Sequence, residues 1–382
     1  MSRPCRRLPV TRGRDALLGG AFVTAEDIVR YAYDRNASDI FIQAGSRPAF
    51  RIGGHIYFSE DLPELTKEQT AALAAEMLSE EQLRRLKEFN EVDAGVEFPG
   101  ITRIRANCFW ATGSIGVVMR LIPLSIPDIE DLGLPPKVRE FATYGDGVVL
   151  VTGPTGSGKT TTLAAVTDLI NAHRQLSIIT IEDPIEFVHR NRKSIVIQRE
   201  LGSDTNSFHD ALKYSLRQNP DVILIGEMRD VETITVALSA AETGHLVFST
   251  LHTTSAGETL ERIVGTFQAE EQELICDRLS YTLRAICAQK LIPSVDGGRA
   301  VAIELMITNA YISKLIKDNK ADGIYERIQE GLHDGMQTME QSLFWLYQAG
   351  WITADDAMRN AGNPLMLRSM MRDHEREVAI NS

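Results

Sequence analysis

The sequence predicts an α/β protein in which a smaller mixed α/β domain precedes a larger domain built on a parallel sheet. The chain of 382 residues is long enough for about two or three domains. Four of its fourteen prolines fall between Pro123 and Pro136, which interrupts regular structure and indicates a linker. Beyond this linker, short apolar runs alternate with helical segments, as strands and covering helices do in parallel α/β sheets.

The N-terminal tail differs in composition from the domain that follows it. Residues 1–21 contain several arginines but no apolar run, so we expect a disordered basic tail and not a signal peptide. Between residues 22 and 120 the signals are those of an α+β domain. Three pairs have the spacing of a capped helix start: Thr24 with Asp27, Thr66 with Gln69, and Ser79 with Gln82. Strands are expected at residues 39–43, 49–52 and 55–58, and antiparallel strands between residues 92 and 119.

The second half of the chain contains the predicted parallel sheet. After a linker at residues 121–140, a domain at residues 141–298 has four apolar runs that suit strands buried on both faces. These runs are Val148–Val151, Ile178–Ile181, Val222–Ile225 and Leu246–Ser249. From about residue 299 to 382 the apolar spacing becomes helical, and one helix face is expected to carry Met336, Met339, Leu343 and Leu346 as a core stripe.

Composition and charge exclude several classes of protein. There are 40 Lys and Arg against 52 Asp and Glu, and the formal net charge of -12 argues against nucleic acid as the main partner. No apolar run approaches the roughly 18 residues that cross a bilayer, so we expect no direct membrane insertion. The four cysteines form no CxxC or CxxH pair, which argues against a zinc site and a disulfide framework and favours a cytoplasmic location.

Residues 153–160, Gly-Pro-Thr-Gly-Ser-Gly-Lys-Thr, match G-x-x-x-x-G-K-[ST] completely. The match follows a predicted strand and precedes residues with helical spacing, which is the context that a phosphate-binding loop requires. Backbone N–H groups of such a loop surround a phosphate, Lys159 would bridge the β- and γ-phosphates, and the Thr160 hydroxyl would ligate Mg²⁺. The sequence therefore predicts an ATP and Mg²⁺ site formed by Gly153, Pro154, Thr155, Gly156, Ser157, Gly158, Lys159, Thr160 and Thr161.

Two predicted strands end in carboxylates that could orient an attacking water. The run at 178–181 continues into Glu182-Asp183-Pro-Ile-Glu186, and the run at 222–225 continues into Gly-Glu227. We expect Glu186 or Glu227 to act on the water, and Glu182 and Asp183 to join Thr160 at the metal. Glycine stands where the second of these strands usually carries an aspartate in P-loop ATPases, so this strand end is atypical.

His245 and His252 flank the apolar run at 246–249. Neither has a neighbour at metal-ligand spacing, so the residues alone favour a structural hydrogen-bonding role. Arg229, two residues after Glu227, suits a γ-phosphate sensor and an ion-pair partner equally well.

Four stretches, in order, resemble the Walker A, Asp box, atypical Walker B and His box of the secretion ATPase superfamily, and especially of the type IV pilus retraction ATPases of the PilT and PilU type. They are residues 153–164, 181–189, 220–230 and 241–253, and the likeness extends over about residues 22–366. It implies a PAS-like N-terminal domain, a RecA-like P-loop NTPase domain and a C-terminal helical region. It also implies a cytoplasmic homohexamer that drives pilus retraction and twitching motility, docked on an inner-membrane pilus platform protein, with a paralogous retraction ATPase as a further candidate partner.

The same resemblance assigns roles to individual residues. It makes Glu186 and Glu227 the catalytic carboxylates. It also implies that Arg103, Arg105 and Arg120, which read as surface or sheet-edge arginines by themselves, complete the site when the N-terminal domain closes. His245 and His252 acquire a place near the phosphates or at a subunit interface.

The likeness departs from the retraction pattern at residues 310–318, Ala-Tyr-Ile-Ser-Lys-Leu-Ile-Lys-Asp, where PilT-type proteins carry Ala-Ile-Arg-Asn-Leu-Ile-Arg-Glu. Lysine cannot form the bidentate fork of arginine. Three functions therefore stay open: a retraction motor, a PilU-like accessory ring that supports a separate motor, and a type II/IV secretion ATPase. A nucleic-acid translocase fits the phosphate loop but not the negative charge.

Overall fold

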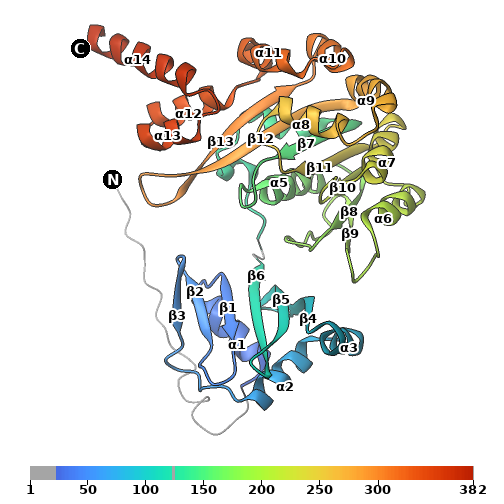
Figure 1. The fold of residues 1–382 in the computed structure, drawn as a ribbon, viewed down its shortest axis with the longest axis vertical. Coiled ribbons are helices and arrows are strands. Elements are labelled where there is room, and N and C mark those ends of the chain that lie inside the picture. Colours follow the sequence, from blue (N-terminus) through green and yellow to red (C-terminus); the bar gives the residue numbers. More distant parts are fainter. Residues whose placement is uncertain (1–22, 123–124, 382) are drawn as a thin grey trace. The chain divides into compact units, whose positions relative to one another are not determined.

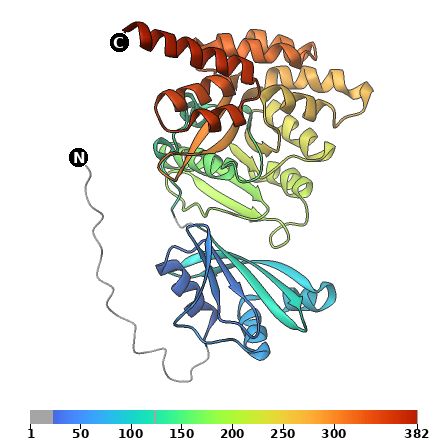
Figure 2. The same ribbon diagram turned by 60° about the vertical axis from the view of Figure 1, so that its left-hand side comes forward.

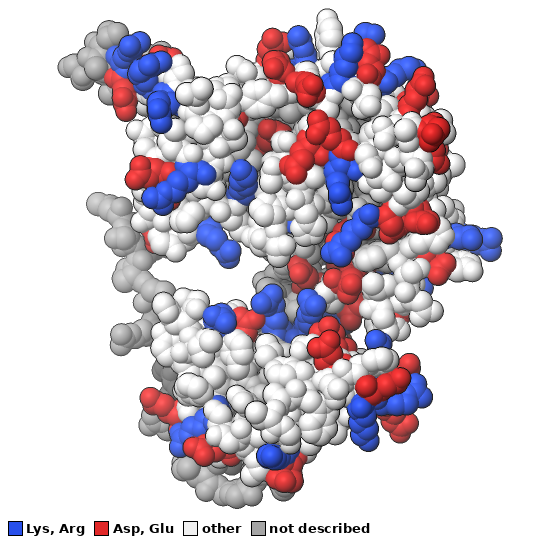
Figure 3. All heavy atoms as spheres, viewed as in Figure 1, with Lys and Arg blue, Asp and Glu red and all other residues white. Residues whose placement is uncertain are grey.

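The structure is a computed structural model that describes residues 23–122 and 125–381. The chain divides into two compact units between Leu124 and Ser125. The predicted basic tail lies outside the described residues. Within the described ranges, no helix combines the length and the apolar character needed to cross a membrane. Basic and acidic side chains are interspersed on the face of each unit drawn in Figure 3.

The first unit is a six-stranded sheet with three helices (Figure 1), in the order β3-β2-β1-β6-β5-β4 with every neighbouring pair antiparallel. Its strands are β1 (Asp39–Ile42), β2 (Ala49–Ile52), β3 (His55–Phe58), β4 (Glu91–Phe98), β5 (Thr102–Ala111) and β6 (Ser114–Ile122). Its helices are α1 (Ala25–Asp34), α2 (Lys67–Met77) and α3 (Glu80–Phe89). Ile28, Leu73 and Leu86 from the three helices share one buried cluster with Ile40, Ile104 and Met119 of the sheet.

The three predicted helix starts in this unit are confirmed. Thr24, Thr66 and Ser79 are N-caps, and each forms a reciprocal capping box with the residue three positions later. Because each box satisfies two backbone donors that the first turn of a helix leaves free, the local sequence fixes where these helices begin.

The second unit contains a seven-stranded sheet in the order β13-β12-β7-β11-β10-β8-β9. Its strands are β7 (Gly147–Thr152), β8 (Ser177–Glu182), β9 (Ile195–Glu200), β10 (Val222–Ile225), β11 (Leu246–Leu251), β12 (Leu283–Pro293) and β13 (Arg299–Ile307). All neighbouring pairs are parallel except β12 and β13. The four predicted runs correspond to β7, β8, β10 and β11, and all four strands are buried except for the first residue of β8.

Helices cover both faces of this sheet (Figure 2). One face packs on α5 (Lys159–His173), α4 (Pro136–Arg139) and two short 3₁₀ turns at Ile129–Leu132 and Glu140–Thr143. The other face packs on α6 (Phe208–Ser215), α7 (Val231–Glu242), α8 (Ala256–Val264), α9 (Ala269–Thr282), α10 (Ala310–Lys317) and α11 (Ile324–Glu330). Alternate residues of β7 therefore face opposite sides of the sheet. Val149 and Val151 pack on the side covered by α5, and Val148 and Leu150 pack on the side covered by α6 to α11.

The expectation that the helical region begins at residue 299 is wrong for its first nine residues. Residues 299–307 form β13, which extends the sheet by pairing with β12 along its whole length. Its sequence, Arg-Ala-Val-Ala-Ile-Glu-Leu-Met-Ile, is buried at alternate and then successive positions. A short apolar run buried on both faces has no distinctive period, so the spacing of these residues does not distinguish a strand from a helix.

The C-terminal helices α12 (Met339–Gln348), α13 (Ala354–Asn360) and α14 (Pro364–Asn381) follow α11. Met339 and Leu343 lie in a buried cluster with Ile292 of β12, and Leu346 packs against it. The predicted helical stripe is therefore confirmed for these three positions. Met336 precedes α12 and belongs to another cluster, because the chain at Gln337 bridges to β13.

Candidate active site

The predicted phosphate-binding loop joins the central strand β7 to α5. Gly158 is the N-cap of α5, with a φ of 89°. Gly153 has a φ of 141°, and a Cβ at this position would lie 2.2 Å from the carbonyl oxygen of Gln289. Only glycine fits where the loop passes this neighbouring strand, so the loop can turn its backbone toward the N-terminus of α5.

Lys159, the first residue of α5, is buried, and its ammonium group folds back over the loop. Its Nζ donates hydrogen bonds to the carbonyl oxygens of Gly153 at 2.8 Å and Pro154 at 3.1 Å. Burial lowers the pKa of this ammonium group, while the negative charges of Glu186 and Glu227 act to raise it. A desolvated cation at a helix N-terminus is therefore close to both predicted catalytic carboxylates.

Gln289 of β12 braces the loop from the side, which the sequence analysis did not identify. Its Nε2 donates to the carbonyl oxygen of Ser157 at 2.6 Å, and its Oε1 accepts from the Thr162 hydroxyl at 3.0 Å. The side chain is buried. A glutamine inside the otherwise apolar run Ala-Ile-Cys-Ala-Gln is the signal that could have indicated a polar partner for this side chain.

Glu227 follows β10 at the same edge of the sheet as the loop. Its Oε2 lies 2.6 Å from Nε of Arg229 and 3.6 Å from Nε2 of His252, which follows β11. Parallel strands bring these two ends together because Ile225 pairs with Ser249 and Leu251 pairs with Thr152. Arg229 is thus an ion-pair partner of Glu227 in this structure.

Gly226, which replaces the usual aspartate, lies where β10 approaches β8. Its N–H donates to the carbonyl oxygen of Ile181 at 2.7 Å. A Cβ at this position would lie 3.3 Å from that oxygen and 3.4 Å from Cα of Glu182. The close backbone approach therefore disfavours a side chain here and leaves Glu227 as the acidic group of this strand end.

The three carboxylates at and after the end of β8 have different surroundings. Asp183 and Glu186 are exposed, whereas Glu182 is buried. Oε1 of Glu182 accepts hydrogen bonds from the Thr180 hydroxyl at 2.6 Å and from Nε2 of Gln198 at 3.2 Å. Burial raises the pKa of this carboxyl group. The Glu182 carboxylate is therefore engaged by Thr180 and Gln198 inside the protein, and Glu182 and Asp183 as metal ligands stay predictions.

His245 and His252 lie at opposite ends of β11. Six residues of extended strand separate them, which corresponds to about 20 Å. Nδ1 of His245 lies 2.9 Å from the Ala240 carbonyl oxygen and 3.1 Å from the Thr243 hydroxyl. The structure therefore places His245 outside the phosphate site of its own chain, which corrects the prediction of a catalytic role for it there. A role at a subunit interface is not tested.

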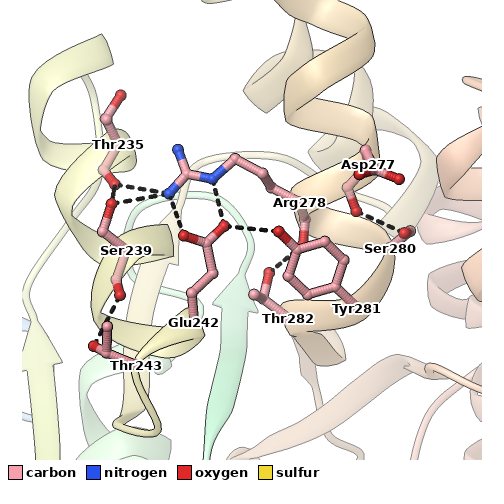
Figure 4. A network of polar contacts seen from close by, with 9 residues as sticks. All are labelled: Thr235, Ser239, Glu242, Thr243, Asp277, Arg278, Ser280, Tyr281 and Thr282. Carbon is pink, nitrogen blue, oxygen red and sulfur yellow. Dashed lines mark hydrogen bonds and ion pairs between the residues drawn. The ribbon is translucent and has the colours of Figure 1, made fainter.

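A second polar cluster lies near His245, at the end of the sheet where β11 and β12 begin (Figure 4). Arg278 of α9 forms a bidentate ion pair with Glu242 of α7, with Nε at 2.5 Å and Nη2 at 2.9 Å. The same Nη2 donates to the Ser239 hydroxyl, and the Tyr281 hydroxyl donates to Glu242. The hydrogen bond from Arg278 is the main cause that lowers the pKa of Glu242. This cluster joins two helices and contains none of the predicted site residues.

The predicted arginines lie in the first unit. Arg103 and Arg105 belong to β5 and Arg120 to β6, and Arg105 pairs with Arg120 across the sheet. Nε of Arg120 donates to the buried carboxylate of Asp39 at 3.0 Å. This bond fixes one side of the guanidinium group, although most of the Arg120 side chain is exposed. Their role in the site stays a prediction.

The residues around the loop fit a magnesium nucleotide. A Cβ at Gly153 would fill the cradle, the N-terminus of α5 and Lys159 supply positive potential, and Thr160 and Thr161 supply half-buried hydroxyl groups. Among the described residues, no group of three or more His, Cys, Asp or Glu side chains could hold a metal by itself. A metal here would rely on Thr160 together with phosphate oxygens, as Mg²⁺ does with nucleotides.

Comparisons with known proteins agree with this geometry. Residues 21–329 match the family described as type II/IV secretion system protein. The chain is 43% identical over 338 residues to the type IV pilus retraction ATPase PilT of Pseudomonas aeruginosa, covering 88% of this chain and 98% of the relative. It is 38% identical to the type IV pilus ATPase PilU of the same organism, covering 91% of each chain.

Two solved structures resemble the fold. A crystal structure of the pilus retraction motor PilT with bound ADP matches at a TM-score of 0.86 and 46% identity, covering 91% of this chain and 99% of that chain. The ATPase DotB of Legionella pneumophila matches at 0.77 and 28% identity, covering 87% and 93%. The architecture is thus the α/β, RecA-like fold of secretion ATPases.

Proposed function

We propose that this chain, which belongs to the type II/IV secretion system protein family, is the ATPase motor that powers type IV pilus retraction. The observation that carries the proposal is the convergence of Lys159, Glu186, Glu227 and His252 at one edge of a RecA-like sheet, in a chain 43% identical to a named retraction ATPase. We further propose that the first unit is a PAS-like domain and that six copies form a cytoplasmic ring.

The residues at the loop divide the work of ATP hydrolysis. Backbone N–H groups and the N-terminus of α5 would hold the phosphates, and Lys159 would exchange its two loop carbonyls for phosphate oxygens. Mg²⁺, held by Thr160 with Asp183 as a further candidate ligand, would neutralise charge on the phosphates. Glu186 and Glu227 are the carboxylates that orient and deprotonate the water, and the His252 and Arg229 contacts fix the position of Glu227.

The arginines of the first unit and the partners complete the proposal. Arg103, Arg105 and Arg120 would contribute positive charge to the transition state, an effect worth about 10³–10⁵ in turnover in P-loop enzymes. Hydrolysis would thereby be coupled to domain movement. The ring would act on an inner-membrane pilus platform protein, with a paralogous retraction ATPase as a second partner.

Replacing the loop lysine tests the proposal in the purified protein and in cells. Lys159→Ala removes the cation that contacts the phosphates, and Lys193→Ala, at an exposed position between β8 and β9, is the matched control. We expect Lys159→Ala to lose ATP hydrolysis and to fail to restore twitching motility to a deletion strain. The Lys193→Ala control should hydrolyse ATP and restore motility. Unchanged hydrolysis by Lys159→Ala would contradict the site assignment.

A second candidate, an accessory ring that supports a separate motor, is favoured by α10. This helix carries Lys317 in place of one of the two arginines of retraction motors and lacks the other, and Lys317 Nζ forms an ion pair with Asp277 of α9 at 2.7 Å. Deleting the gene distinguishes the two functions. Complete loss of retraction with excess surface pili supports the primary motor, and residual retraction supports the accessory ring. A secretion ATPase is the third alternative, and loss of protein export with normal twitching would support it.

A further inference from the structure

The loop that carries Glu186 is held by side chains of the edge strand β9. Gln198 and Glu200 lie two positions apart on this strand, so both side chains project from the same face. Gln198 is in register with Thr180 of β8, and Glu200 is in register with Glu182, the last residue of that strand. The two side chains are therefore next to the point where the chain leaves β8 for residues 183–189.

Hydrogen bonds from these side chains reach the backbone on both sides of Glu186. On one side, the N–H of Ile185 donates to Oε2 of Glu200 at 3.1 Å. On the other side, Nε2 of Gln198 donates to the carbonyl oxygen of Phe187 at 2.8 Å, and Oε1 of Gln198 accepts from the N–H of His189 at 2.8 Å. The backbone is thus fastened immediately before and immediately after the exposed Glu186 side chain.

The Gln198 amide also fastens the loop to the buried interior of the unit. Its Nε2 donates a second hydrogen bond, at 3.2 Å, to the carboxylate of Glu182, which also accepts from the Thr180 hydroxyl. The amide oxygen and both amide hydrogens of Gln198 have partners. A leucine at position 198 would remove the hydrogen bonds to Glu182, Phe187 and His189 without changing the side-chain volume much.

We propose that Gln198 and Glu200 are positioning residues for Glu186, which set the turnover rate by holding its backbone at the edge where Lys159 lies. The inference rests on the proposed ATPase function. Catalysis is sensitive to such placement, because a shift of about 1 Å in a reacting group can cost about 100-fold in rate. Neither residue needs to touch the nucleotide, so their loss is expected to lower kcat while leaving the KM for ATP unchanged.

The first experiment compares variants that keep or remove the hydrogen bonds. Gln198→Leu removes every hydrogen bond made by the Gln198 side chain and leaves the one from Ile185 to Glu200. Glu200→Gln keeps an acceptor for Ile185, and Glu200→Leu does not. We expect Gln198→Leu and Glu200→Leu to lower kcat about 10- to 100-fold with KM unchanged, and Glu200→Gln to retain most of the wild-type rate. Ile197→Thr, on the opposite face of β9, is the control and should hydrolyse ATP normally.

A double-mutant cycle with Glu186→Ala separates positioning from general stability. If Gln198 acts through Glu186, Gln198→Leu should cost nothing further in single-turnover hydrolysis by the Glu186→Ala protein. An equal additional loss in that background, or a change in KM with kcat intact, would overturn the inference. Should Gln198→Leu fail to fold, the Glu200→Leu and Glu200→Gln pair carries the same cycle. Normal hydrolysis by Glu186→Ala itself would instead contradict the proposed function.

Discussion

The two ends of the parallel sheet carry polar clusters of similar composition but different completeness. At the end where β11 and β12 begin, Glu242 accepts hydrogen bonds from Nε and Nη2 of Arg278 and from the Tyr281 hydroxyl. The Arg278 side chain is only 13% exposed. At the carboxyl ends of β10 and β11, Glu227 contacts Arg229 and His252, whose side chains are 72% and 48% exposed. The first cluster is closed by the protein, whereas the second ends in groups that face outward.

This difference teaches which carboxylates serve structure and which are available for chemistry. Both carboxylate oxygens of Glu242 are engaged by Arg278 and Tyr281 within the protein, which leaves this carboxylate little capacity to bind a substrate. The carboxyl ends of β8 and β10 instead combine a buried cation whose pKa is lowered, glycines that admit a phosphate, the exposed Glu186 and the partly buried Glu227, whose partners Arg229 and His252 face outward. We call the end of the sheet with Glu242 the structural edge and the carboxyl ends of β8, β10 and β11 the carboxyl edge. Each variant below changes a group at one edge, and a group at the other edge or elsewhere serves as the reference.

The largest effect is expected from removing a carboxylate charge at each edge. Glu186→Gln should reduce ATP hydrolysis by about 10²–10⁴-fold, the range for loss of a general base. Glu242→Gln should leave the turnover of the folded protein unchanged, because its partners belong to α9. Steady-state hydrolysis assays on both proteins check this pair, and comparable losses in both would break the distinction between the edges.

Arg278→Ala tests the structural edge through stability. The substitution leaves Glu242 without its bidentate partner, so the free energy of unfolding should fall by about 1–3 kcal/mol. Arg359→Ala, at an exposed position on α13, is the matched control and should change it by less than about 0.5 kcal/mol. Urea denaturation of the three proteins measures both values, and an unchanged midpoint for Arg278→Ala would argue against the network.

The two histidines provide a smaller contrast on a single strand. His252→Ala removes a neighbour 3.6 Å from the Glu227 carboxylate and should lower kcat by less than about tenfold, because a contact of this length between partly exposed side chains contributes at most about 1 kcal/mol. His245→Ala should not affect hydrolysis by the single subunit's site. Rates measured at equal fractions of folded protein test this, and a larger loss for His245→Ala would indicate an interface role for that residue.

The smallest expected effect is a pH dependence at the structural edge. The pKa of Glu242 is lowered in the folded protein, chiefly by its hydrogen bond with Arg278. The stabilisation is therefore present above the pKa of this group in the unfolded chain and is lost as the pH falls through its lower folded value. The difference in unfolding free energy between the wild type and Glu242→Gln should shrink from pH 7 to pH 4. A difference that stays constant would mean that the carboxylate charge contributes nothing.

Local signals in the sequence were sufficient for the phosphate loop and for several elements. Glycines at fixed spacing, a strand before them and a helix after them require no distant partner, and the same is true of the capping box at Thr66. The pairing of Gln289 with Ser157 and Thr162 was not predictable, because strand order brings together residues far apart in the chain. The role of Gln198 was not predictable either, because exposed and buried polar residues of an edge strand have the same sequence pattern.

Two contrasts at the site also have a physical explanation. Glu182 and Glu186 both belong to the acidic stretch at the end of an apolar run, yet Glu182 is the last residue of β8 and is buried, whereas Glu186 lies in the following loop and is exposed. His245 and His252 flank one apolar run in the sequence, and the extended strand between them places them about 20 Å apart.

The most direct test of the account is ATP hydrolysis by the wild type and by Glu227→Ala, measured together with the mass of each particle in solution with ATP and Mg²⁺. The account predicts a six-subunit particle for both proteins, and hydrolysis by the wild type that is lost in Glu227→Ala. A particle that binds ATP but hydrolyses it equally slowly with and without Glu227 would contradict the assignment of the carboxyl edge as a catalytic site.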